Sequence, residues 1–127
     1  MNQIKLKFLE LKTFTEQNAL DYCQINNINQ DNITILYLYH NKLTNISGIR
    51  LFKNTESLYL FGNKLTDISV IKDLNNLKWL SINYLELESD QIKYINKCKN
   101  LETLICINGF KNRSILNQLN KDIIKIK

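Results

Sequence analysis

A pattern of apolar and polar positions recurs along this chain every 22 residues. Residues 33–54 read ITILYLYHNKLTNISGIRLFKN, and residues 55–76 read TESLYLFGNKLTDISVIKDLNN, so both contain LYLxxNKLTxIS. Residues 77–100 repeat the pattern with two extra positions, and residues 101–122 form a weaker copy. The tail from Ile123 begins a further strand in the same phase. Repetition at a fixed period predicts stacked structural repeats.

Each copy divides into two halves with different apolar spacing. The first half alternates as a strand does, which points every second residue inward. The inward positions are Leu36, Leu38, Leu58, Leu60, Leu80, Ile82, Leu104 and Cys106. The second half has a spacing of three, typical of a helix or a 3-10 turn. Its apolar positions are Ile46, Ile49, Phe52, Ile68, Ile71, Leu74, Ile92, Ile95 and Cys98. We therefore expect successive copies to stack, with parallel strands about 4.8 Å apart.

The consensus LxxLxLxxNxLxxIxxLxxLxx resembles that of leucine-rich repeats, and NKLTxIS is most similar to the bacterial 22-residue class found in internalins. The resemblance covers residues 33–127 and is specific in the first two copies. In the third and fourth copies, Leu85 and Gly109 replace the expected Asn. The resemblance implies an α/β solenoid, with a parallel sheet on the concave face and short helices or 3-10 turns on the convex face.

The same resemblance implies a role for the residues that follow each strand. Asn41 and Asn63 occupy the position whose side chain bonds backbone groups through the turn in this repeat class. Leu43 and Leu65 follow two residues later and are expected to close the corner.

Residues 1–32 do not fit the repeat frame, and we predict that they form an N-terminal cap. Ile4, Leu6 and Phe8 alternate as in a strand. Thr13 or Thr15 is expected to N-cap a helix that extends to about Cys23, and Glu16 follows Thr13 at the spacing of a capping box. The residues expected to face the first repeat are Leu20, Tyr22 and Cys23.

The repeats then occupy residues 33–127 and end in a C-terminal cap. We expect this cap to be a helix over residues 113–121, followed by the tail strand. Its apolar face would contain Ile115, Leu116 and Leu119.

Composition places the chain among ordinary globular proteins. Of its 127 residues, 44% are hydrophobic and 23% are charged, which is typical of one folded domain. The net charge is +5, and it comes from fifteen Lys and only two Arg. Because Arg provides the forked contacts common in nucleic-acid recognition, we interpret the charge as a lysine-rich solvated surface.

Cysteine usage and the apolar runs predict a cytoplasmic protein. Cys23, Cys98 and Cys106 are odd in number and form no CxxC, which favours buried thiols in a reducing compartment. The N-terminal sequence MNQIKLKFLELK lacks the continuous apolar segment of a secretory signal. The apolar runs are also too short to span a membrane.

Few residues indicate catalytic or metal chemistry. His40 is the only His, and no ligand cluster has zinc or iron spacing. The three glycines are too far apart in the sequence to cradle a phosphate. Glu86, Glu88 and Asp90 fall in the expanded third copy and are expected to form a solvated loop, and Cys106 is a core position. We therefore predict no catalytic residue, no metal, no cofactor and no enzymatic activity.

The strongest functional signal is the set of residues between the inward leucines. In a leucine-rich repeat these residues line the concave sheet, where Tyr37 would neighbour Tyr59 and Tyr39 would neighbour Phe61. The candidate binding residues are Tyr37, Tyr39, His40, Tyr59, Phe61, Trp79, Tyr84, Ile105 and Ile107. Six aromatic side chains could contribute up to about 1,000 Å² if fully covered, and a standard interface buries about 800 Å² per partner.

This surface predicts a protein-binding module that acts as an inhibitor or regulator of its partner. The abundance of Ile, Asn and Lys indicates an AT-rich genome. One version of the hypothesis is therefore a phage or mobile-element inhibitor of a host defence nuclease, such as a CRISPR effector. The alternatives are a single-stranded nucleic-acid-binding protein and a homodimeric or larger scaffold component. A structural alternative is that the aromatic rings only stabilise the sheet or receive the N-terminal segment.

Overall fold

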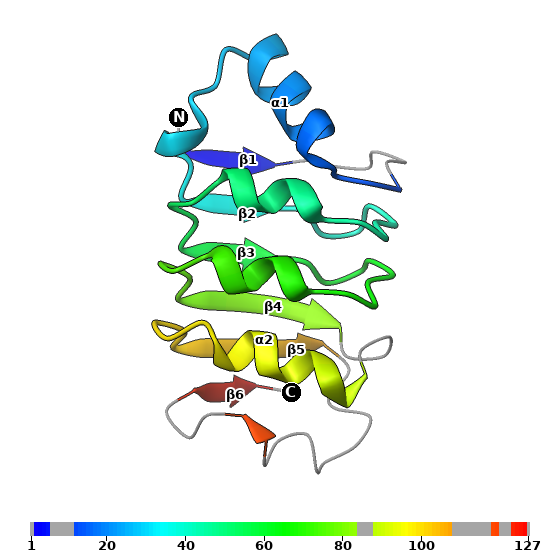
Figure 1. Ribbon diagram of the computed structural model, residues 1–127, viewed down its shortest axis with the longest axis vertical. Coiled ribbons are helices and arrows are strands. Elements are labelled where there is room, and N and C mark those ends of the chain that lie inside the picture. The colour runs from blue at the N-terminus through cyan, green and yellow to red at the C-terminus, as the bar shows by residue number, and fades with distance from the viewer. Residues whose placement is uncertain (1, 6–11, 84–87, 108–117, 120–122, 127) are drawn as a thin grey trace.

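The computed structural model describes residues 2–5, 12–83, 88–107, 118–119 and 123–126. Its strands form one parallel sheet, in which each strand pairs with the next along the chain (Figure 1). The strands are β1 (Gln3–Lys5), β2 (Ile35–Tyr37), β3 (Ser57–Tyr59), β4 (Trp79–Asn83), β5 (Thr103–Ile107) and β6 (Ile124–Ile126). Short helical segments alternate with these strands, so the predicted α/β class with a parallel sheet is confirmed.

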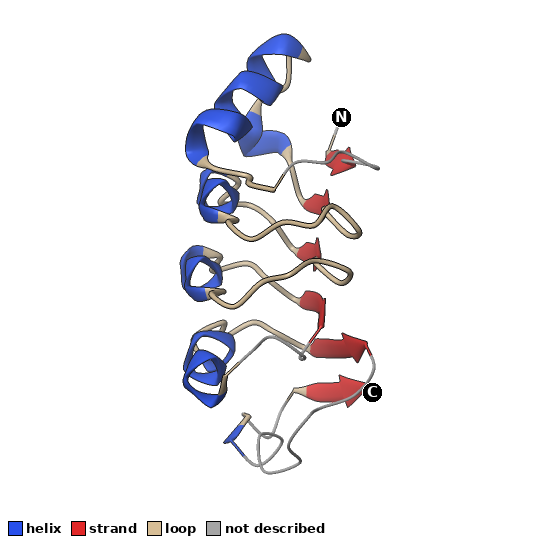
Figure 2. Ribbon diagram, turned by 90° about the vertical axis from the view of Figure 1, so that its right-hand side faces the viewer, coloured by secondary structure: helices blue, strands red, loops and turns tan. Residues whose placement is uncertain are grey.

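The helical segments are α1 (Glu16–Ile25), η1 (Gln30–Asn32), η2 (Ser47–Leu51), η3 (Ser69–Asp73), η4 (Ser89–Gln91) and α2 (Ile92–Asn96), where η denotes a 3-10 helix. Figure 2 shows η2, η3 and α2 on one side of the molecule and the strands on the other. The predicted apolar stripe of η2, η3 and α2 is buried along its whole length. None of the helices in the described part of the chain is long and apolar enough to cross a lipid bilayer.

The strand register follows the sequence repeat. Leu36 lies opposite Leu58, and Leu58 lies opposite Leu80, so each leucine faces its equivalent in the next copy. Leu80 likewise lies opposite Leu104, so the two extra positions of the third copy do not disturb the sheet. All eight predicted inward positions are buried. The apolar face of these strands is therefore covered by the neighbouring strands and by the helical layer.

Asn63 links two neighbouring turns of the chain through four hydrogen bonds. Its Oδ1 accepts from the backbone N–H groups of Asn41 and Leu43, both at 3.0 Å. Its Nδ2 donates to the carbonyl oxygens of Leu38 at 2.8 Å and Leu60 at 2.9 Å. The side chain is buried, so these bonds form away from water, where an unpaired polar group is costly. The predicted bonding of this Asn through the turn is confirmed.

The N-terminal segment forms a longer turn of the same arrangement. Ile4 lies opposite Leu36, and Thr13 forms an isolated bridge with Asn45, so both pairs have the same offset along the chain. This offset is longer than one repeat, because α1 replaces the shorter 3-10 helix at this level. Of the predicted strand, Leu6 and Phe8 lie outside the described residues.

The details of α1 differ from the prediction in two respects. Thr15 is the N-cap, and its capping-box partner is Asn18, whose Oδ1 accepts from the Thr15 N–H at 3.0 Å. The predicted box between Thr13 and Glu16 is therefore wrong. Leu20 is 43% exposed, whereas Ala19 is buried beside Cys23. Residues 19 and 23 are four apart and lie one above the other on the helix, and Leu20 is turned about 100° away from Ala19.

The C-terminal cap is described in part. Most of the predicted helix over residues 113–121, including Ile115 and Leu116, lies outside the described residues, although Leu119 is buried. The predicted tail strand is present as β6, but its register is wrong by one residue, because Ile126 lies opposite Ile105 rather than Leu104.

Candidate functional site

Six rings gather on the side of the sheet that faces away from the helical layer. Five are partly exposed and His40 is exposed. They belong to β2, β3, β4 and the turns that follow β2 and β3. We call this surface the aromatic strand face, and it consists of Tyr37, Tyr39, His40, Tyr59, Phe61 and Trp79.

Two ring pairs stack between neighbouring turns of the chain. The centroids of Tyr37 and Tyr59 are 4.7 Å apart with 23° between their planes. Those of Tyr39 and Phe61 are 5.0 Å apart with 3° between their planes. Both distances match the spacing of about 4.8 Å between hydrogen-bonded strands, because equivalent side chains on adjacent strands are held at that separation. Both predicted neighbour pairs are confirmed.

Edge contacts join the two stacks into one connected cluster. Tyr37 and Tyr39 meet at 89° with centroids 6.3 Å apart. The His40 ring meets Phe61 edge-on at 5.1 Å, and Trp79 lies tilted against Tyr59 at 6.3 Å. Offset-stacked and edge-to-face arrangements are the ones that aromatic quadrupoles favour. The rings therefore support one another and present a continuous surface.

Stacking determines which parts of these rings a ligand can reach. The two ring pairs lie face to face, so each pair covers one face of each member. The second face of Tyr37 is approached by the Lys5 ammonium, which lies 5.8 Å from the ring centroid, and that of Tyr59 by Trp79. Side chains stand roughly perpendicular to a sheet. For Tyr37 and Tyr59, the outer edges and the hydroxyls therefore face a ligand, rather than the flat faces.

The hydroxyl of Tyr59 remains a hydrogen-bond donor over the physiological pH range. Desolvation, with a smaller contribution from the neighbouring Tyr37, raises the pKa of Tyr59. Neutral tyrosines that combine apolar ring edges with a hydroxyl are typical of protein-binding surfaces.

Gly62 makes room for the imidazole of His40, a role that sequence reasoning missed. A Cβ on Gly62 would overlap Nδ1 of His40. Gly62 also has φ +79°, which favours glycine, while His40, one repeat earlier, has φ 56°. The Gly62 N–H donates to Asn83 Oδ1 at 2.8 Å. The exchange of His for Gly between the first two copies was the signal in the sequence that could have revealed this packing.

The indole N–H of Trp79 is the one buried side-chain polar atom that lacks a hydrogen-bond partner among the described residues. Leaving such a group unpaired costs about 1–3 kcal/mol. Ser81 lies opposite Tyr59 on β3 and Ile105 on β5, and it is buried. This small residue interrupts the series of large side chains along the sheet.

The remaining predicted binding residues are placed less completely. Ile105 is partly buried on β5, where it lies opposite Ser81. It extends the aromatic strand face with an aliphatic side chain. The backbone of Ile107 lies opposite Asn83, but its side chain is outside the described part of the structure. Tyr84 is also outside the described residues.

Cations border the aromatic strand face. Lys42 and Lys64 are exposed just beyond the ends of β2 and β3. Lys78 is paired with Glu56 at 3.2 Å, between two partly exposed side chains, so this pair contributes little to stability. Lys5 over Tyr37 is a further cation on this face that sequence reasoning did not place there.

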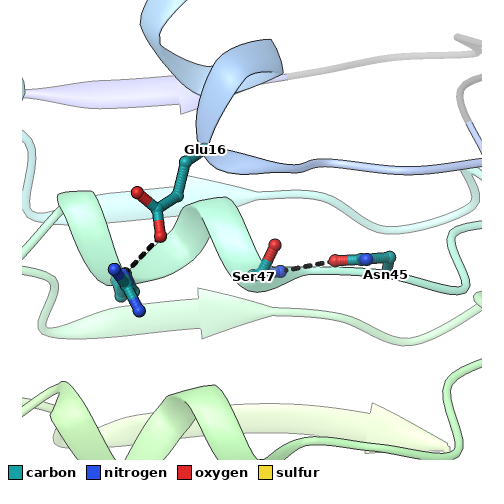
Figure 3. Close-up of polar contacts among 4 residues, drawn as sticks. Glu16, Asn45 and Ser47 are labelled. Atoms are coloured by element: carbon teal, nitrogen blue, oxygen red, sulfur yellow. Dashed lines mark hydrogen bonds and ion pairs between the residues drawn. The ribbon is translucent and has the colours of Figure 1, made fainter.

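The helical side contains a shallow cavity of about 200 Å³, lined by Thr44, Asn45, Ile46, Ser47, Asp67, Ser69 and Val70. Its polar side chains are engaged in local turns, since Asn45 Oδ1 accepts from the Ser47 N–H at 2.9 Å (Figure 3). Asp67 Oδ1 does the same for Ser69 at 2.8 Å, and this hydrogen bonding lowers the pKa of Asp67. The Asn45 and Asp67 side chains that line the cavity therefore stabilise local turns of the fold.

The other residues considered for chemistry are also in structural or solvated positions. The three cysteines are buried, and desolvation raises the pKa of Cys98 to about 11. Glu88 and Asp90 are exposed, as predicted, although Asp90 lies in η4 rather than in a loop, and Glu86 lies outside the described residues. No group of three or more His, Cys, Asp or Glu residues in the described ranges could hold a metal ion.

Comparison with known proteins adds no assignment. No protein-family model matches the chain, and no curated protein matches it.

Proposed function

We propose that this chain is a non-enzymatic protein-binding module of the leucine-rich repeat class, whose aromatic strand face binds a partner protein and inhibits or regulates it. The observation that carries the proposal is the connected cluster of six rings on the side of the sheet without a helical layer. Monomeric proteins rarely expose a contiguous patch of large apolar side chains without a binding function.

Three features support the repeat class. Strand pairing advances by one sequence repeat from β2 to β3 and again from β3 to β4. The side chain of Asn63 bonds backbone groups of two successive turns. Each of the first two copies places a 3-10 helix on the side opposite the strands. In a solenoid of this class, curvature would make the aromatic strand face concave.

A protein partner fits the chemistry of the aromatic strand face better than bases of a single-stranded nucleic acid. Base stacking requires an open ring face. Here the rings of Tyr37 and Tyr59, and of Tyr39 and Phe61, are stacked on each other. Their outer edges suit the apolar side chains and backbone carbonyls of a polypeptide. Tyr and Trp are also enriched among residues that dominate binding energy.

The size of the surface indicates what else the partner contacts. A standard interface buries about 800 Å² per partner. The estimate of roughly 1,000 Å² for fully exposed side chains included Tyr84, which lies outside the described residues, and the described rings cover one another, so they provide less area than that. The interface would therefore extend to the exposed Lys42 and Lys64. Their charge would favour and steer an acidic partner. Occlusion of that partner's own site is the simplest route to inhibition.

The test compares three proteins as bait in a nuclease-treated lysate of the source organism. The baits are wild type, Tyr37→Ala/Tyr59→Ala, and Tyr22→Ala as a matched control on α1, which is part of the helical side. Thermal unfolding confirms that each bait is folded. We expect one stoichiometric protein that wild type and the control retain and the double variant loses. Equal retention by all three would refute a role for the aromatic strand face.

Self-association through the same face is the second candidate. Sedimentation velocity over a wide concentration range distinguishes it from binding of another protein. A concentration-dependent dimer that Tyr37→Ala/Tyr59→Ala abolishes would replace a heterologous partner with a second copy of the chain. A monomer at all concentrations would exclude the homodimeric scaffold.

A further inference from the structure

A second cluster lies on the helical side of the molecule and is centred on Tyr94 of α2. Three ammonium groups approach its ring: Lys93 Nζ at 5.2 Å from the centroid, and Lys72 Nζ and Lys97 Nζ each at 5.9 Å. We call these four residues the tyrosine–lysine cluster. Because all three ammonium groups surround one ring, they form a compact group of positive charges.

The repeat geometry brings the cluster together. Lys72 belongs to η3, and Tyr94 lies one repeat later in α2, so stacking places them on adjacent turns. Lys93 precedes Tyr94, and Lys97 is the C-cap of α2. The Tyr94 ring is partly buried against the core, which holds it in place. The lysine ammonium groups can then lie over its negative ring face.

Within the described part of the chain, the three lysines have no opposite charge in contact, in contrast to Arg50 and Lys78. Arg50 is paired with Glu16 at 2.6 Å, and Lys78 is paired with Glu56 at 3.2 Å. Among the described residues, none of the three cluster lysines forms an ion pair. Asp67, which lies near Lys72, is engaged by hydrogen bonds with Ser69. A neutral ring therefore holds three positive charges that an anionic ligand would neutralise.

We propose that the tyrosine–lysine cluster binds the phosphate backbone of a nucleic acid by charge, without reading its sequence. Nucleic acids present closely and regularly spaced phosphates, so cations gathered around one ring can contact several of them. Lys binds phosphate as a point charge and does not need the fork of Arg. Composition alone indicated a generic lysine surface, and the convergence of three lysines on one ring is what the structure adds.

The cluster belongs to η3 and α2, which lie on the side opposite the strands (Figure 2), so this proposal is independent of the proposed protein binding. One molecule could hold a protein on its sheet side and a nucleic acid on its helical side. Such a module would act on a partner that is itself close to nucleic acid.

The number of contacts predicts the salt dependence. Three lysine–phosphate contacts to duplex DNA contribute about −2.7 to the slope of log K against log salt concentration. Raising the salt from about 50 to 200 mM should therefore weaken the contribution of this cluster about 40-fold.

The experiment measures fluorescence anisotropy of a labelled DNA duplex of about 20 base pairs over that salt range. The test variant is Lys72→Gln/Lys93→Gln/Lys97→Gln. The matched control, Lys5→Gln/Lys42→Gln/Lys64→Gln, removes the same net charge from the strand side. We expect the test variant to lose at least about tenfold in affinity at low salt and about 2.7 of the slope. The control should lose much less, and Tyr37→Ala/Tyr59→Ala should bind DNA as wild type does.

Three outcomes would overturn the proposal. The first is no binding of wild type to the duplex at the lowest salt concentration. The second is an equal loss of affinity and slope in the two triple variants, which would show that only net charge matters. The third is that polyglutamate or phosphatidylserine vesicles bind to the cluster more tightly than DNA, which would assign it to an acidic protein or a membrane surface.

Discussion

Replacing Asn63 with Ala should destabilise this protein more than any exposed polar substitution. The change removes two bonds accepted from backbone N–H groups and two donated to carbonyl oxygens, all in a buried position. Losing the acceptor of a buried N–H costs about 1–3 kcal/mol, and losing a donor to a carbonyl costs about 0.5–1.5 kcal/mol. The expected loss in the free energy of unfolding is therefore about 3–9 kcal/mol, a large part of the roughly 5–15 kcal/mol typical of a domain.

Urea unfolding followed by far-UV circular dichroism measures this loss. The midpoint should fall while the slope of the free energy against urea stays constant, because the same surface is exposed on unfolding. Asn54→Ala is the matched control, since Asn54 is exposed and donates one hydrogen bond, to the Asp31 carbonyl at 2.7 Å. The control should cost less than about 1 kcal/mol. An Asn63→Ala cost as small as that of the control would refute the structural role of this side chain.

Three further predictions concern two glycines and a buried thiol. Gly62→Ala should cost at least about 1 kcal/mol in thermal unfolding, because of its positive φ and the clash with His40, and His40→Ala in the same chain should recover only the clash. Gly48→Ala should destabilise more, because its Cβ would overlap the backbone oxygen of Thr15, and a cost below about 1 kcal/mol would contradict the close approach. Cys98 should not react with a thiol reagent near neutral pH while the chain is folded. Its folded pKa of about 11 exceeds the ordinary value of 9.0, so its contribution of up to about 3 kcal/mol is complete below pH 9 and is lost between pH 9 and 11. Urea unfolding across this range should show a smaller loss of stability with pH in Cys98→Ala than in wild type.

The candidate binding residues were predicted in part because a parallel sheet leaves little freedom. Once Leu36, Leu58 and Leu80 are aligned, the residues one position further along must also be neighbours. This alignment is why the stacks of Tyr37 on Tyr59 and of Tyr39 on Phe61 could be expected. The direction of the exposed ring edges could not be predicted, because it depends on the rotation of each side chain about its Cα–Cβ bond.

The N-terminal segment shows where the repeat pattern gives no information. Its alternating residues predicted a strand, but nothing in its sequence gives the longer offset that places β1 beside β2. That offset depends on Gly48, which lets the backbone at Thr15 approach η2 closely, and on the bridge between Thr13 and Asn45. The sequence also predicted that Leu20 lies on the buried face of α1, whereas Ala19 is the residue that packs against the core.

The sequence by itself determined the strands, the buried positions and the stacking partners within the repeats, because period and phase of apolar residues are properties of the chain. Only the tertiary structure decided the register of β6, the buried N–H of Trp79 and the convergence of Lys72, Lys93 and Lys97 on Tyr94. Each of these depends on distances between side chains of different turns or on the competition of neighbours for one buried site. A linear pattern contains neither.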